Sequence, residues 1–161
     1  MDNRSATEEW AVDIRDMSFA YDKDTVLQHV SMQVSPGDFT AVIGPNGGGK
    51  TTLLKLMLGL LKPDAGEILI FGQPPMQGAS QVGYVPQDVH TDTSFPITAM
   101  DVVMMGLLQP ARRWQRTPAA DKRRVLAMLD RLEIADQANR RIGELSGGQR
   151  QRVFIARALV T

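Results

Sequence analysis

The first half of the chain carries short apolar runs and alternations of apolar and polar residues that are typical of β-strands. Five segments fit these patterns: residues 12–21, 30–34, 39–43, 67–71 and 81–85. The run at residues 39–43 follows a turn signal, Ser-Pro-Gly-Asp at residues 35–38, and predicts a short strand buried on both faces. A second turn, Pro-Asp-Ala-Gly at residues 63–66, precedes the strand at residues 67–71.

Helical patterns follow residue 49 and dominate the second half. Residues 50–60 predict one helix and residues 98–108 predict another. Thr117 and Pro118 are expected to be the cap and the first residue of a third helix. Its apolar stripe consists of Val125, Leu126, Leu129 and Leu132. We therefore expect an α/β core followed by a helical subdomain that starts near residue 91.

Composition narrows the class of protein. A chain of 161 residues with 43% apolar residues has the size of one domain and can bury a core. Lys plus Arg and Asp plus Glu balance at 18 each, so no net positive charge attracts nucleic acid or anionic lipid. Cysteine is absent, which excludes disulfides and cysteine-ligated metals. No signal peptide and no apolar segment of about 20 residues is visible, so a soluble, cytosolic domain is expected.

Residues 44–51, Gly-Pro-Asn-Gly-Gly-Gly-Lys-Thr, match the phosphate-binding pattern G-x-x-x-x-G-K-[ST] at every fixed position. Glycines let the backbone curl so that its N–H groups point at phosphate oxygens, and the following helix turns its positive end toward the same anion. Lys50 adds a charge for the β- and γ-phosphates, and the Thr51 hydroxyl is suited to ligate Mg²⁺. An ordinary glycine turn would not need the Lys-Thr pair. The pattern therefore predicts a nucleoside triphosphate site, which kinases, GTPases and motor ATPases share.

A second glycine-containing loop, Leu-Ser-Gly-Gly-Gln at residues 145–149, opens another predicted helix. Ser146 is a good N-cap, and Gly147 and Gly148 expose backbone N–H groups beside it. Such groups form a second anion site at a helix N-terminus. A helix with an ordinary serine cap and a glycine entry explains the same residues without a ligand. These residues by themselves do not decide between the two interpretations.

Together, the two loops and their order resemble the ABC ATPase family, and the resemblance covers nearly the whole chain. It implies an α/β fold: a P-loop NTPase (RecA-like) core with an antiparallel β subdomain and an inserted α-helical subdomain. It also implies that Gln87 is the Q-loop glutamine at the junction of core and helical subdomain, and that Tyr21 stacks on adenine. The alternatives are a solvated loop amide for Gln87 and a buried core tyrosine for Tyr21. The expected parts are residues 1–90 as core, residues 91–147 as helical subdomain and residues 148–161 as signature helix.

The resemblance implies ATP and Mg²⁺ as cofactors. The residues expected to bind ATP are Tyr21, Gly44, Asn46, Gly47, Gly48, Gly49, Lys50, Thr51, Thr52, Ser146, Gly147, Gly148 and Gln149. Catalytic roles fall to Lys50, Gln87 and Ser146, and the residues expected to hold the Mg²⁺ of Mg·ATP are Thr51 and Gln87.

The implied mechanism pairs two such domains head to tail as a homodimer. Each ATP then lies between the phosphate loop (residues 44–51) of one chain and the signature (residues 145–149) of the other, and closure acts on membrane-embedded permease subunits. This arrangement places the domain peripherally on the cytoplasmic side of the cell membrane. Nucleic acid is not an expected partner.

The family pattern continues beyond the signature helix with an apolar strand that ends in Asp-Glu (the Walker B motif), followed by a switch histidine. The sequence stops at Thr161, before either feature. We therefore expect a partial ABC nucleotide-binding domain, truncated after the signature helix, with the C-terminal part of the core missing. The family hydrolyses ATP, but hydrolysis by these residues alone is not expected. A non-catalytic nucleotide-binding fragment stays an alternative, as does an ABC-type ATPase that acts on DNA or ribosomes, which the balanced charge disfavours.

Residues 94–106 look like the corresponding segment of zinc- and manganese-uptake ATPases. The resemblance therefore implies an energy-coupling subunit of a metal-ion importer, with iron-chelate or other ABC transport as the alternative. The apolar residues of this segment include Phe95, Ile97, Met100, Val103 and Met104. We expect the segment between Asp88 and Gly106, through these side chains, to dock onto a membrane subunit. Packing against the helix at residues 121–132 is the alternative.

Overall fold

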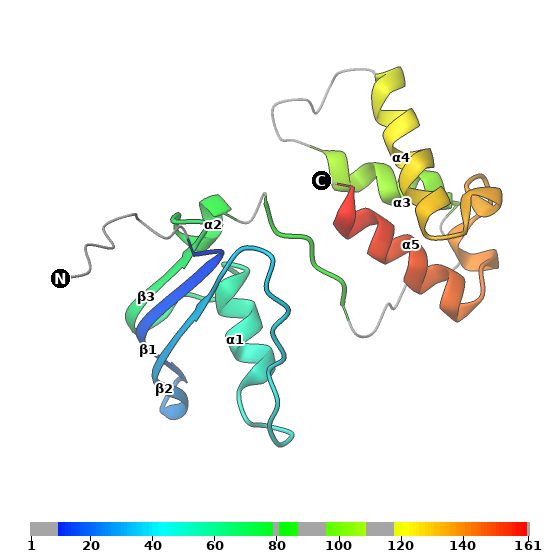
Figure 1. Cartoon of the computed structure of the whole chain (residues 1–161). Coiled ribbons are helices and arrows are strands. Elements are labelled where there is room, and N and C mark those ends of the chain that lie inside the picture. Colours follow the sequence, from blue (N-terminus) through cyan, green and yellow to red (C-terminus); the bar gives the residue numbers. More distant parts are fainter. Residues whose placement is uncertain (1–9, 79–80, 87–95, 109–117, 161) are drawn as a thin grey trace. The chain divides into compact units, whose positions relative to one another are not determined.

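The computed structural model describes residues 10–78, 81–86, 96–108 and 118–160. The chain divides into two compact units, Met1–Val82 and Gly83–Thr161 (Figure 1). The division that we expected near residue 90 falls outside the described residues. The chain enters the second unit at Gly83.

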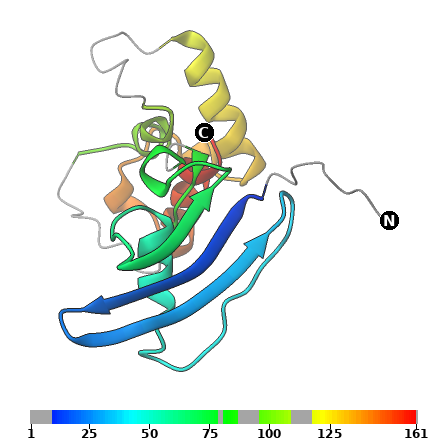
Figure 2. The ribbon, with the colours of Figure 1, turned by 90° about the vertical axis from the view of Figure 1, so that its left-hand side faces the viewer.

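The first unit contains an antiparallel sheet of three strands in the order β2-β1-β3 (Figure 2). These strands are β1 (Val12–Tyr21), β2 (Asp24–Val34) and β3 (Ala65–Ile70). Tyr21 pairs with Asp24 where β1 turns into β2, and Ile14 pairs with Ile68 on the other side of β1. The strands predicted at residues 12–21, 30–34 and 67–71 are therefore confirmed. The strand β2 begins at Asp24, earlier than its alternation indicated.

The helix α1 (Lys50–Met57) packs against this sheet and closes the core of the first unit. That core consists of Ile14, Met17, Phe19, Leu53, Leu56, Ile68 and Ile70. The helix begins at the predicted residue but ends before the predicted Leu60, because Gly59 takes a left-handed φ of 70° that ends a helix. A shorter helix, α2 (Pro75–Gly78), follows β3.

One charged side chain is buried in this sheet. Asp13 is 3% exposed, and its carboxylate accepts hydrogen bonds from Arg15 at 2.5 Å and from Gln33 at 3.1 Å. Burial alone would raise the pKa of Asp13, but the hydrogen bonds from Gln33 and Arg15 and the charge of Arg15 outweigh it and lower the pKa. The carboxylate thus stays ionised and ties β1 to β2.

The strand predicted at residues 39–43 is wrong. The segment forms no strand, and Phe39 and Ile43 are 97% and 91% exposed. A strand buried on both faces needs neighbours that satisfy its backbone N–H and C=O groups, and no strand of the described residues pairs with this segment. The apolar run is real, but nothing in the described part of the chain covers it.

The strand predicted at residues 81–85 is also wrong, since its described backbone joins no sheet. The carbonyl of Tyr84 instead accepts a hydrogen bond from Arg157 at 3.4 Å. The predicted turn at residues 63–66 is shorter than expected, because Ala65 and Gly66 already belong to β3. Asp64 holds the turn to β1 by accepting a hydrogen bond from the Ala20 N–H at 2.8 Å.

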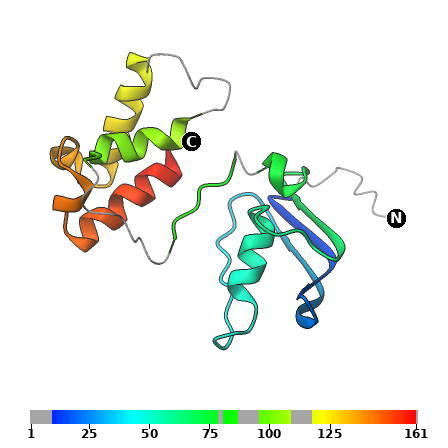
Figure 3. The same cartoon turned by 180° about the vertical axis from the view of Figure 1, so that it is seen from behind.

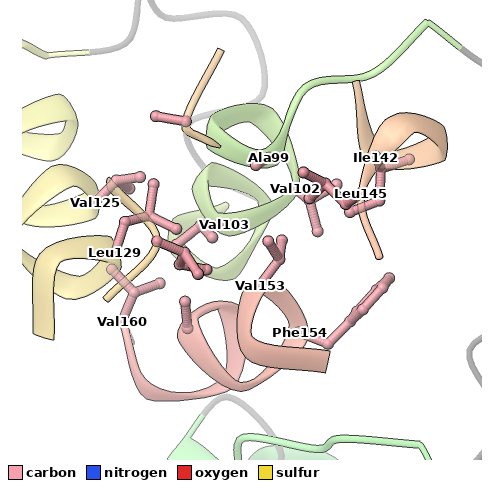
Figure 4. Close-up of a cluster of buried hydrophobic side chains, with 13 residues drawn as sticks. Ala99, Val102, Val103, Val125, Leu129, Ile142, Leu145, Val153, Phe154 and Val160 are labelled. Carbon is pink, nitrogen blue, oxygen red and sulfur yellow. The ribbon is translucent and has the colours of Figure 1, made fainter. Parts of the chain in front are cut away.

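The second unit is helical, and α3, α4 and α5 pack against one another (Figure 3). Its elements are α3 (Ala99–Met104), the 3₁₀ turn η2 (Met105–Leu107), α4 (Ala119–Arg131), the 3₁₀ turns η4 (Ala135–Gln137) and η5 (Ile142–Glu144), and α5 (Gly147–Leu159). Figure 4 shows the buried side chains between them. The core consists of Ala99, Val102, Val103, Val125, Leu129, Ile134, Ala138, Ile142, Leu145, Val153, Phe154, Ala156 and Val160.

The helix α4 differs from its prediction in two details. Pro118 is the N-cap rather than the first helical residue, and Thr117 lies outside the described residues. Val125 and Leu129 are fully buried, but Leu126 is 40% exposed. Leu126 follows Val125 directly and therefore points about 100° away from it around the helix. The buried stripe is narrower than the sequence suggested.

The segment expected to dock onto a membrane subunit contributes to the core of the second unit instead. Val103 is fully buried, and Ile97, Met100 and Met104 pack against the core. These four side chains therefore pack inside the unit, against a core that contains Val125 and Leu129 of the helix named in the alternative and also residues of α5. Phe95 lies outside the described residues. None of the helices in the described part of the chain is long and apolar enough to cross a membrane.

Candidate nucleotide-binding site

The predicted phosphate loop leads directly into the first turn of α1. Gly47 and Gly49 have left-handed φ angles of 80° and 78°, which other residues rarely adopt. Between them, the Gly48 N–H donates to the Pro45 carbonyl at 3.1 Å. The glycines therefore produce the curl that the pattern predicted.

Gly49 is favoured by its φ angle first and by close packing second. A methyl group added to it would lie 2.8 Å from Leu27 Cδ2 and 3.2 Å from the Val26 carbonyl oxygen. Residue 49 is thus pressed against β2 while it serves as the N-cap of α1. This contact joins residues far apart in the sequence, and no signal in the sequence pointed to it.

The side chain of Lys50 lies across the loop. Its Nζ donates to the Gly44 carbonyl at 2.8 Å and to the Pro45 carbonyl at 2.6 Å. The ammonium therefore lies against the carbonyls of the first two loop residues. Asn46 and Thr51 are exposed, whereas Thr52 is 8% exposed and largely buried.

Tyr21 stands at the end of β1 in the same unit as the loop. Its side chain is 43% exposed, so the alternative of a buried core tyrosine is wrong. The ring packs edge to face on Phe19, with ring centroids 4.9 Å apart, and this contact restrains its orientation.

The second glycine loop lies in the helical unit and caps α5. The Ser146 Oγ accepts from the Gln149 N–H at 3.3 Å, and the Gln149 Oε1 accepts from the Ser146 N–H at 2.9 Å. This reciprocal pair is a capping box, so both residues have a structural role. Gly147 and Gly148 differ, because a methyl group added to either would meet no atom within 4 Å and neither has a positive φ.

The structure thus groups the predicted residues in two sets. Tyr21, Thr52 and residues 44–51 belong to the first unit, and residues 146–149 belong to the second. Gln87 lies outside the described residues. Sequence reasoning did not single out Arg157, whose contacts with Tyr84 and Phe154 depend on chain packing rather than on a motif.

Curated proteins with similar sequences are ATP-binding proteins of metal transport systems. The probable metal transport system ATP-binding protein of Chlamydia muridarum is 44% identical over 98% of this chain. The zinc uptake system ATP-binding protein ZurA of Listeria innocua is 42% identical over 93%, and the manganese transport system ATP-binding protein MntB of Bacillus subtilis is 43% identical over 92%. The chain spans 60%, 60% and 59% of the length of these three relatives.

Solved structures with the same fold are ATP-binding parts of ABC transporters. The chain matches cbiO1 of Clostridium perfringens, part of the ABC transporter complex cbiONQ, with a TM-score of 0.79 and 29% identity over 95% of this chain and 62% of that one. An ATP-binding cassette of an ABC transporter in its ADP conformation matches with a TM-score of 0.76 and 26% identity, over 94% and 65%. The family model for ABC transporters matches residues 27–161. On this match and on the two glycine loops described above, the chain belongs to the ABC transporter family, as an α/β domain of the P-loop ATPase type.

Proposed function

We propose that the chain is part of the ATP-binding, energy-coupling subunit of an ABC importer, and that ATP binds in the curl of residues 44–51. The observation that carries this proposal is the left-handed curl at Gly47 and Gly49 with α1 starting at Lys50. The first N–H groups of a helix have no partner within it and favour an anion beyond its end. In this proposal, these N–H groups and the Lys50 ammonium bind the same phosphates.

Lys50 is proposed to exchange its present partners for phosphate oxygens. Its two hydrogen bonds go to neutral carbonyls, those of Gly44 and Pro45. Phosphate oxygens carry negative charge and the carbonyl oxygens do not, so the exchange adds Coulombic attraction to the ammonium. The exchange therefore favours the bound state. In that state, phosphate oxygens replace the two loop carbonyls as the partners of the ammonium.

Thr51 fits a role toward Mg²⁺. Its side chain is exposed beside the loop, and its hydroxyl forms no hydrogen bond with the described residues. Mg²⁺ prefers oxygen ligands and usually keeps several waters and phosphate oxygens, so one protein oxygen suffices. When bound, the ion would neutralise charge on the phosphates. Gln87, the other proposed ligand, lies outside the described residues.

Tyr21 is proposed to stack on the adenine. An exposed ring, restrained from below by Phe19, offers a flat apolar face without a further ordering cost. Asn46 and Thr52 complete the proposed set in the first unit. Because Thr52 is largely buried, its part would be to hold the first turn of α1 rather than to contact the nucleotide broadly.

The loop at residues 146–149 is proposed to bind the γ-phosphate of ATP held by a second copy of the chain. Glycine within a helix costs about 0.5–1 kcal/mol relative to alanine. Gly147 and Gly148 fill no tight space, so packing does not explain them. Their missing side chains leave the N-terminus of α5 open to a close approach. The proposed homodimer follows, with two composite sites.

In the complete subunit, ATP binding is proposed to close the dimer and hydrolysis to release it. Closure would act on membrane-embedded permease subunits from the cytoplasmic side. The residues in this sequence after the signature include no carboxylate, so the general base for hydrolysis is not among them. General-base assistance contributes about 10²–10⁴-fold to such reactions.

Zinc or manganese is the proposed cargo. The support is that relatives at 42% and 43% identity are named for zinc uptake and for manganese transport. The test is uptake of radiolabelled Zn²⁺ and Mn²⁺ by cells that carry or lack the gene. We expect loss of uptake of one of these ions in the deletion. Unchanged metal uptake with loss of iron-chelate uptake would favour the alternative cargo.

Substituting Gly148 with Glu tests the signature proposal. Glu in the first turn of a helix interacts favourably with the helix dipole, and the space around Gly148 is open, so we expect equal or higher stability. The same carboxylate would repel the γ-phosphate, so nucleotide-driven pairing should be lost. Thermal unfolding and analytical ultracentrifugation with a nonhydrolysable ATP analogue measure both effects. A G148E protein that still pairs with nucleotide would contradict the assignment.

A further inference from the structure

The C-terminal turn of α5 is packed against two glycines from distant parts of the second unit. A methyl group added to Gly83 would overlap the Ala158 carbonyl oxygen, and one added to Gly106 would overlap the Arg157 carbonyl oxygen. Neither glycine has a positive φ, so backbone conformation does not require glycine at either position. The close approach of the two backbones does. Both glycines therefore allow the segments that contain them to pack closely against the C-terminal turn of α5.

Arg157 adds a side-chain contact to the same place. Its Nη2 donates to the Tyr84 carbonyl at 3.4 Å. The guanidinium carbon lies 5.0 Å from the centroid of the Phe154 ring, which is 7% exposed. The ring supports the guanidinium from one side, as in other cation–π pairs. Residues 83–84 are thus held to α5 by backbone packing and by one side chain.

The two ends of α5 have different tasks. Ser146 caps its N-terminus beside the signature glycines, and the turn at Arg157 receives the incoming chain. A 13-residue helix is about 20 Å long, and its continuous backbone hydrogen bonds connect the two ends. Gly83, which packs against Ala158 of α5, is also the residue at which the chain enters the second unit.

We propose that Gly83 and Arg157 are positioning residues for the signature. They fasten α5 to the entry point of the second unit, and so they set where residues 146–149 lie when two chains close on ATP. This inference rests on the proposed function, since it assumes nucleotide-driven pairing. Neither residue contacts the nucleotide in this scheme, so their loss should change pairing and leave nucleotide binding intact.

The test compares two arginines of the same helix in the full-length protein. Arg157→Met keeps the aliphatic stem but removes the charge and the donor toward Tyr84. Arg152→Met is the matched control, because Arg152 donates to the Leu132 carbonyl and to Glu133 instead. With Mg²⁺ and a nonhydrolysable ATP analogue, nucleotide affinity is measured by calorimetry and dimer formation by sedimentation.

We expect R157M to bind the analogue with a Kd within about twofold of the unsubstituted protein. The analogue concentration for half-maximal pairing should rise about tenfold, within the 5- to 150-fold range of typical coupling between sites. R152M should change neither quantity by more than about twofold. Gly83→Ala should act in the same direction as R157M, and R157M decides the matter if G83A does not fold.

Two results would overturn the inference. One is an R157M protein that pairs as readily as R152M, and the other is an equal loss of pairing in both variants, which would indicate general destabilisation. A third result would bear on the proposed function and not on this inference. If the unsubstituted protein binds no nucleotide or never pairs, the proposed function is contradicted rather than the role of Arg157.

Discussion

Replacing Lys50 with alanine is expected to weaken Mg·ATP binding by about 10- to 100-fold. A charge-assisted contact contributes about 1.5–3 kcal/mol, and each 1.4 kcal/mol is tenfold in Kd. Lys50 is also the side chain that reaches from the first turn of α1 across the loop to the Gly44 and Pro45 carbonyls. Isothermal titration calorimetry with the full-length protein measures the effect.

Lys55 provides the control for this experiment. It lies on the same helix and is exposed, but it belongs to the last turn of α1 rather than to the first. Lys55→Ala removes the same charge from the protein as Lys50→Ala does. We expect a Kd within about twofold of the original, because solvent and salt screen exposed charges at that distance. Equal affinities of the K50A and K55A proteins would show that general charge, rather than the loop, binds the nucleotide.

Leu129→Ala is expected to destabilise the second unit strongly and to leave the nucleotide loop untouched. Leu129 is fully buried among α3, α4 and α5 (Figure 4), and truncation of a buried leucine costs about 2–5 kcal/mol. Leu126, in the same helix, is 40% exposed, and L126A should cost well under about 1 kcal/mol. The loss of stability in each variant is measured by urea unfolding, with hydrogen exchange of the α4 and α5 amides as the probe. Similar losses for the two variants would mean that the packing described for α4 is incorrect.

Leu129 and Leu126 also show how much of α4 the spacing of apolar residues could predict. The spacing of Val125, Leu126, Leu129 and Leu132 predicted a helix with one apolar face, and α4 is that helix. Spacing does not show how wide the covered stripe is, because that depends on the neighbours that pack against it. The cap at Ser146 was predictable for the opposite reason, since a capping box involves residues only three apart.

The strand predicted at residues 39–43 is absent because a strand needs a neighbouring strand, which a local pattern does not specify. An apolar run indicates burial but does not identify the strand that would lie beside it. Within the candidate site, the order of the glycines and Lys50 was readable because the loop is built from eight consecutive residues. Two other contacts could not be predicted, because each joins segments that are distant in the sequence. They are the contact of Gly49 with Val26 and Leu27 and the contact of Gly83 with Ala158.

The central claim is that one ATP is held by the phosphate loop of one chain and the signature of another. Mixing the K50A and G148E proteins tests it most directly. Each variant alone lacks one half of both composite sites, whereas a mixed dimer contains one intact site, built from the phosphate loop of the G148E chain and the signature of the K50A chain. We expect neither variant to pair alone with the nonhydrolysable analogue and Mg²⁺, and the mixture to form dimers that contain one copy of each. No pairing in the mixture, or full pairing of either variant by itself, would contradict the composite site.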